Sequence, residues 1–229
     1  MDITNDGWLV GVKRVPGPAD KIYSARNSVS GYIPHSAVGY YPGWANRLFS
    51  TTRDSNGRYT SYAAASVHGW ISYDGTIIQH YSFYASCWAS GNFPQNTSFV
   101  AFENEGGYSP YNEPLTDRQN DANIAIIDAL SRWKNWKPSR PSSSTDPSAT
   151  IYQHKEAVKI WGGRPTACGS DRFPFTLWLR ELENINMVDE KARQLMSVAA
   201  LGHELSAAAL AGKPVDEATK RALLYLLSR

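Results

Sequence analysis

The chain has 229 residues, of which 42% are hydrophobic and 19% are charged, and its formal net charge is +2. These values are ordinary for a globular protein, and the length suffices for one substantial domain with a small appendage. A charge so close to zero gives no sign of the basic stripe of a nucleic-acid-binding protein, and no segment approaches the ~18 apolar residues that a membrane span needs.

The amino-terminal segment MDITNDGWLV has neither a basic region nor an apolar run, unlike a secretory signal. We therefore expect synthesis in the cytoplasm without a signal peptide. The two cysteines, Cys87 and Cys168, show no disulfide spacing, and a reducing cytosol disfavours their pairing. Cys87, in ASCWAS, is interpreted as a small buried residue, whereas Cys168 lies in a turn flanked by glycine and proline.

Predicted strands begin at residues 30–43, SGYIPHSAVGYYPG, where β-prone residues give way to small and turn-forming residues after His35. We expect a strand that delivers His35 into a loop at its carboxyl end. Residues 67–81 contain Asp74 and Gly75 between two β-prone runs, which predicts a β-hairpin.

The segment SFVAFENEGG reads as a strand that ends in Glu103 and Glu105 before two glycines. Strand side chains alternate with a period of two, so both glutamates are expected on one face, with Glu105 at the strand's end. The next segment, PLTDRQNDANIAIIDALSRW, opens with Thr116 and Gln119 in capping-box spacing and continues with isoleucines and a leucine at helical spacing. It predicts an amphipathic helix.

The Pro- and Ser-rich segment 137–148 is expected to be a loop, and ATIYQH a short extended segment that ends at His154. A helix is predicted over 173–184.

From about residue 186 the composition shifts to Ala, Leu, Glu, Lys and Arg, interrupted by GKP at 212–214. This indicates a helical hairpin over 186–229 behind a body over 1–185. Strands interspersed with helices in that body predict an α/β fold, with a mixed central sheet flanked by helices.

His35 and His154 each end a predicted strand, where folded scaffolds present functional groups. With Cys168 they supply two imidazoles and a thiolate, the donor set of a catalytic zinc site that keeps its fourth position open. Their spacing alone leaves open that the histidines are structural and that Cys168 is a buried residue or a nucleophile.

Five segments resemble, in the same order, motifs of the zinc-dependent N-acetylmuramoyl-L-alanine amidases. They are GYIPHSAVG, SVHGWISYDGTIIQHY, NTSFVAFENEGG, PLTDRQ and HKEAVKIWGGRPTACGSDRFP. This is the type 2 amidase fold, which also includes phage endolysins and peptidoglycan recognition proteins, and the resemblance covers roughly residues 8–183. It implies a zinc-activated water that cleaves the amide between N-acetylmuramic acid and L-Ala in bacterial peptidoglycan.

The resemblance also implies a role for individual residues. His35 in PHSA, His154 in QHKEA and Cys168 in TACGSD match the three zinc ligands. Glu103 in VAFENEG matches the glutamate that acts as general acid and base.

Three further residues, His68, Trp88 and Thr166, are predicted to bind substrate. His68 matches a histidine of the hairpin strand, which either lines the groove or forms structural hydrogen bonds. Trp88 offers an aromatic surface for a sugar, and Thr166 stands where some family members have lysine. Val67 stands where many members have a catalytic tyrosine, so no tyrosine role transfers.

Two other functions are compatible with the sequence. One is a peptidoglycan-binding relative without catalysis, although such receptors typically lose the cysteine ligand that Cys168 matches. The other is a structural or assembly protein that works through the hairpin at 186–229, which also offers a surface for homo-oligomers. The missing signal peptide suits an endolysin that reaches the wall after a phage-type membrane lesion.

Overall fold

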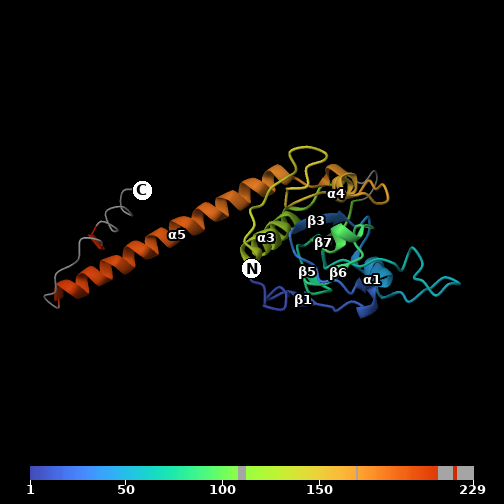
Figure 1. Ribbon diagram of the computed structural model, residues 1–229, viewed down its shortest axis with the longest axis horizontal. Coiled ribbons are helices and arrows are strands. Elements are labelled where there is room, and N and C mark those ends of the chain that lie inside the picture. The colour runs from blue at the N-terminus through green and yellow to red at the C-terminus, as the bar shows by residue number, and fades with distance from the viewer. Residues whose placement is uncertain (108–111, 169, 211–218, 221–229) are drawn as a thin grey trace. The chain divides into compact units, whose positions relative to one another are not determined.

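The computed structural model describes all residues except 108–111, 169, 211–218 and 221–229 (Figure 1). The chain divides into two compact units, residues 1–179 and residues 180–229. Among the described residues, no helix is both long enough and apolar enough to cross a membrane.

The described part of the first unit contains a five-stranded mixed sheet and a separate two-stranded one. The strands of the large sheet, in spatial order, are β1 (Lys13–Arg14), β5 (Ile77–Gln79), β4 (Gly69–Ile71), β7 (Phe99–Asn104) and β3 (Gly31–Ser36). β4 and β5 are antiparallel, and the other neighbours are parallel. The small sheet pairs β2 (Ile22–Tyr23) with β6 (Ser86–Cys87).

β3 and β7 position two of the candidate site residues, His35 and Glu103. The two strands are parallel over six residue pairs, so their carboxyl ends meet at one edge of the sheet. The register sets His35 beside Glu103, and Glu103 in turn beside Trp70 of β4. Because paired residues point to the same face, the imidazole of His35 and the carboxyl of Glu103 rise from one face of the sheet.

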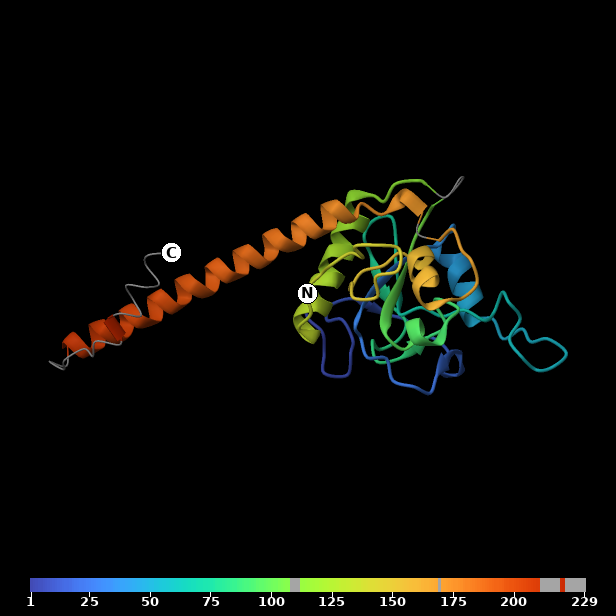
Figure 2. The ribbon, with the colours of Figure 1, turned by 45° about the horizontal axis from the view of Figure 1, so that its top comes forward.

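Helices cover both faces of the sheet (Figures 1 and 2). They are α1 (Tyr41–Phe49), α2 (Phe93–Asn96), α3 (Asp117–Lys134) and α4 (His154–Trp161). The chain also forms α5 (Phe175–Leu210) and 3-10 turns at η1 (Ala19–Lys21) and η2 (Ser170–Arg172). α3 lies on one side of the sheet, and α1 and α4 lie on the other (Figure 2).

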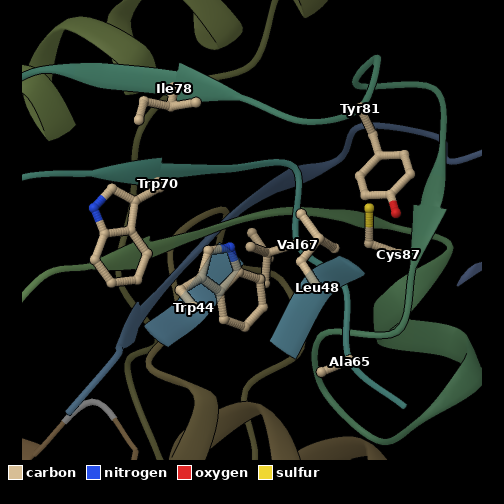
Figure 3. Packing of buried hydrophobic residues seen from close by; sticks show 9 residues of the cluster. Trp44, Leu48, Ala65, Val67, Trp70, Ile78, Tyr81 and Cys87 are labelled. Carbon is tan, nitrogen blue, oxygen red and sulfur yellow. The ribbon is translucent and has the colours of Figure 1, made fainter. Parts of the chain in front are cut away.

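Packing against α1 forms one of the buried clusters. Trp44 and Leu48 of α1 pack with Trp70 of β4 in this cluster (Figure 3). The rings of Trp44 and Trp70 are stacked, with centroids 6.3 Å apart. Cys87 belongs to the same cluster and is 1% exposed, so it is the small buried residue that the sequence predicts. Neither cysteine forms a disulfide bond.

The local predictions for the hairpin and for α3 are confirmed. β4 and β5 are the hairpin strands, and Gly75 in their turn has a positive φ of 81°. α3 begins with a reciprocal capping box, in which Thr116 accepts from the Gln119 amide and the Gln119 side chain accepts from the Thr116 amide. The extended segment before His154 forms a single bridge between Ile151 and Tyr32, and His154 is then the first residue of α4.

The predicted helix end near residue 184 is wrong, because α5 runs without interruption from Phe175 to Leu210. No glycine or proline occurs between Phe175 and Leu201, so nothing in the sequence breaks the helix there. The first helix of the predicted hairpin is therefore the continuation of the helix before it. The GKP turn, and all of the second helix but Thr219 and Lys220, lie outside the described residues.

Candidate active site

Three segments that are distant in sequence bring His35, His154 and Cys168 together. His35 lies near the carboxyl end of β3, His154 begins α4, and Cys168 lies in the loop between α4 and η2. One nitrogen from each ring and the Cys168 sulfur lie within 4.8 Å of one another. The ring centroids of His35 and His154 are 4.6 Å apart, and Cys168 Sγ is 3.6 Å from Nδ1 of His35.

The ring nitrogens that face one another in this cluster fit a metal ion. His154 Nε2 lies 3.2 Å from the Ser90 carbonyl and donates to it, which leaves Nδ1 with its lone pair. His154 Nδ1 is buried and has no hydrogen-bond partner among the described residues, and the His35 nitrogen on the side of the Cys168 sulfur is Nδ1. Buried polar atoms are rarely left without a partner, and a bound cation supplies one. Two imidazoles with one thiolate are a donor set that zinc favours.

Burial also keeps both imidazoles in the form that binds a metal. It lowers the pKa of His35 well below its ordinary value, and neighbouring His154 lowers it further. The pKa of His154 is lowered for the same reason, burial. Both rings are therefore neutral at neutral pH, as a metal ligand must be.

Glu103 provides a buried carboxyl next to the three donors. Desolvation raises its pKa to about 7, against the opposing effect of the Arg47 and Arg172 guanidinium groups. Its Oε2 atom is buried without a hydrogen-bond partner in the described structure. A carboxyl with a pKa near neutrality can both accept and release a proton at working pH.

Glu105 is used differently, although it follows Glu103 by two residues. Its carboxylate oxygens accept hydrogen bonds from the backbone amides of Tyr41 (3.2 Å) and Tyr73 (2.9 Å). The side chain therefore ties the start of α1 and the turn between β4 and β5 to the residue that follows β7. This contact distinguishes the two glutamates that strand periodicity leaves equivalent.

A cleft of about 490 Å³ contains all four groups and two of the predicted substrate-binding residues, Trp88 and Thr166. The Thr166 hydroxyl accepts from the Cys168 amide at 3.0 Å, so it also shapes the loop that carries the sulfur. The indole Nε1 of Trp88 is buried without a partner among the described residues.

Sequence reasoning missed two arginines of the cleft wall, Arg47 and Arg164. Arg47 follows Trp44 by three residues on α1, and this helical spacing is the signal that places both on the cleft side. Arg164 lies in the loop that leads to Cys168.

His68 is placed apart from the cleft lining. It is 1% exposed, its Nδ1 accepts from the Ala101 amide at 3.0 Å, and its Nε2 donates to the Ala85 carbonyl at 2.9 Å. Both ring nitrogens thus connect β7 to the segment before β6. This geometry favours the structural alternative over substrate binding.

The buried His68 ring predicts acid sensitivity of the metal-free protein. Burial lowers its pKa from 6.5 to about 4, so between these values the unfolded chain binds a proton that the native ring does not. The free energy of unfolding is therefore highest above pH 6.5, the pKa of His68 in the unfolded chain. It decreases as the pH falls towards about 4, the pKa of His68 in the native protein. The loss from this residue is about 3 kcal/mol of unfolding free energy.

Urea unfolding at neutral and acidic pH measures this loss. His68→Gln, which keeps one donor and one acceptor, should show a smaller difference between the two pH values. An equal difference in both proteins would contradict the assignment.

Comparison with known proteins identifies the family. The model of the family described as N-acetylmuramoyl-L-alanine amidase matches residues 25–170, which include the three candidate ligands and Glu103. The chain belongs to this amidase family. No curated protein is a significant sequence match.

Several solved structures share the fold. The N-acetylmuramoyl-L-alanine amidase LysC from Clostridium intestinale URNW is 18% identical with a TM-score of 0.52, and the match covers 76% of this chain and 99% of that one. A selenomethionine derivative of AmpD is 22% identical with a TM-score of 0.56, over 80% and 99% of the two chains. A mutant endolysin from Bacillus subtilis is 13% identical with a TM-score of 0.50, over 76% and 99%.

The mixed sheet with helices on both faces is thus the type 2 amidase fold that the sequence predicts. Family membership supports amidase activity on peptidoglycan.

Proposed function

We propose that the chain is a zinc-dependent amidase of bacterial peptidoglycan that hydrolyses the bond between the N-acetylmuramic acid lactyl group and L-Ala of the stem peptide. The observation that carries the proposal is the convergence of two imidazoles, one thiol and the buried Glu103 carboxyl in one cleft. The family match supports the same bond, because its description names that activity.

In this proposal His35, His154 and Cys168 hold the zinc. When bound there, zinc supplies a Lewis acid that polarises the scissile carbonyl and acidifies water. The Ser90 carbonyl orients the His154 ring through Nε2, which directs Nδ1 to the metal. The Ser36 amide donates to Cys168 Sγ at 3.4 Å and stabilises negative charge on the sulfur.

Glu103 moves the proton. Its unpartnered Oε2 accepts a proton from water as the water oxygen attacks the lactyl carbonyl carbon. The same oxygen then gives this proton to the L-Ala nitrogen as the carbon–nitrogen bond breaks. The remaining hydroxyl proton of the lactyl carboxylic acid then passes to the amine. The products are a lactyl carboxylate and an L-Ala ammonium group, so atoms and charge balance.

The remaining lining of the cleft suits a saccharide with an attached peptide. Trp88 offers an aromatic face of the kind that sugars stack on, and Thr166 offers a hydroxyl near the reacting atoms. Arg47 and Arg164 add positive charge, which favours carboxylates of the stem peptide.

The proposal is tested by incubating the full chain with purified cell walls and identifying the released termini by mass spectrometry. New lactyl carboxylates and L-Ala amino termini are expected, with loss of both in the presence of a chelator and recovery when zinc is added back. Wall binding without new amino termini would instead identify a non-catalytic relative, and new reducing sugars would identify a glycosidase.

We also propose that residues 1–185 form the catalytic part and that residues 186–229 associate with a second copy of the chain. In support, Met187, Val188, Leu195 and Met196 on α5 are between 58% and 68% exposed. Exposed apolar side chains that recur along one helix favour burial against another surface.

A chain that ends after Asn184 is expected to keep zinc and wall hydrolysis and to lose self-association. Zinc content and light scattering after gel filtration measure the two properties. Leu195→Gln in the full chain tests the same surface without shortening the helix, and it should weaken self-association because it removes one exposed apolar side chain. An insoluble truncated protein would show that residues 186–229 belong to the fold of the catalytic part.

A further inference from the structure

Arg172 is a buried guanidinium close to the candidate metal site. It ends η2, four residues after Cys168, and is 2% exposed. Burying an arginine is costly unless its N–H groups find acceptors, because the guanidinium cannot release its proton. The position of its acceptors therefore shows what this residue stabilises.

Those acceptors lie at the ends of three segments. Nη1 donates to the Ser36 hydroxyl at 3.1 Å and to the Asn104 carbonyl at 3.2 Å, and Nη2 donates to the Glu105 carbonyl at 2.6 Å. Nε donates to the carbonyl of Glu113, in the connection before α3, at 2.6 Å. One side chain thus joins the carboxyl ends of β3 and β7 to the segment that carries Cys168.

The backbone leaves room for this contact. Gly107 has a positive φ of 89°, and a Cβ atom there would collide with Oγ of Ser36 and lie 3.3 Å from Nη1 of Arg172. A larger residue at this position would compete with the guanidinium for the same space.

The acceptors are chain neighbours of the reacting residues. Ser36 follows His35, and its amide donates to Cys168 Sγ at 3.4 Å. Asn104 follows Glu103, and its side chain donates to the His35 carbonyl at 3.3 Å. A shift of the Arg172 guanidinium would therefore move the carboxyl ends of both β3 and β7.

The loop that carries Cys168 is also bound to the start of α4. The Lys155 amide, next to His154, donates to the Cys168 carbonyl at 3.2 Å. Cys168 is thus held towards α4 through its own carbonyl, and towards β3 and β7 through Arg172. The three segments that supply the candidate ligands are joined by residues next to those ligands.

We propose that Arg172 is a positioning residue for the metal site, which holds the Cys168 sulfur where it binds zinc together with the two imidazoles. This inference rests on the proposed function, because it requires the metal site. The guanidinium acts through its forked geometry, since it reaches acceptors on three segments at once, which an ammonium group on a single stem cannot do.

Arg172→Gln and Arg172→Lys test this proposal in the full chain. Zinc affinity is measured by competition with a chelator, and the site is also probed with cobalt(II), whose thiolate charge-transfer band reports the bond to sulfur. We expect Arg172→Gln to lose about 10- to 100-fold in zinc affinity, the range for residues that orient metal ligands. Arg172→Lys is expected to lose less but to remain weaker than the unsubstituted protein, and the cobalt band should weaken in both.

Leu130→Ala is the matched control for general destabilisation, because Leu130 is 0% exposed and lies on α3, on the other side of the sheet. It should lower the melting temperature and leave zinc affinity and the cobalt band unchanged. Unchanged affinity and an unchanged band in Arg172→Gln would overturn the proposal, and the same result in Arg172→Lys would do so if the Gln variant does not fold. An unsubstituted chain without zinc would instead overturn the metal site itself, a distinct outcome.

Discussion

The Cys168→Ser variant is expected to lose zinc and wall hydrolysis together, from a starting content of about one zinc per chain. A coordinated thiol is deprotonated and binds zinc as a thiolate, whereas a serine hydroxyl keeps its proton at neutral pH and is a much weaker ligand. The two imidazoles alone leave the donor set one ligand short. We expect a fall in zinc affinity larger than the 10- to 100-fold typical of residues that only orient ligands.

Elemental analysis after dialysis and the rate of release of L-Ala amino termini measure the two losses. Cys87→Ala is the matched control, since Cys87 is the other cysteine of the chain. It is buried, with 1% of its surface exposed, in the cluster that packs against α1. It should lower stability without changing zinc content. Full zinc occupancy with normal turnover in Cys168→Ser would remove Cys168 from the site.

The Glu103→Gln variant is expected to keep the fold and the zinc while its turnover falls by about 100-fold or more, the range for removing a positioned acid and base. That loss corresponds to about 3 kcal/mol of transition-state stabilisation. Glutamine has nearly the shape of glutamate but can neither take the proton from water nor give it to the leaving nitrogen. The metal-free variant should unfold at no lower a temperature, because burial disfavours the carboxylate that it removes.

Glu105→Gln is the matched control, two residues along the same chain segment. The Glu105 carboxylate holds the amides of Tyr41 and Tyr73, and a glutamine retains one acceptor for them. We expect a lower melting temperature and near-normal turnover. If Glu105→Gln were the variant that lost turnover, the acid and base role would have to move from Glu103 to Glu105.

Short-range patterns are sufficient for several elements of this fold. The capping box of Thr116 and Gln119 and the turn at Gly75 depend on residues within one helical or β turn, so their signals are complete in a few positions. The order of five motifs likewise predicts the family from residues alone, and the family match over 25–170 confirms it. The prediction that a helix ends near residue 184 is wrong, because a change of composition is not a helix stop signal.

Contacts between distant segments decide the rest. Glu103 and Glu105 are equivalent in a period-two pattern. The structure distinguishes them, because the amides of Tyr41, at the start of α1, and Tyr73, in the β4–β5 turn, donate to the carboxylate of Glu105. The sequence leaves two roles open for His68 and indicates none for Arg172, and the partners of both side chains lie on remote segments. Such roles depend on which polar groups lose water together when the sheet and helices pack, and sequence spacing does not contain that information.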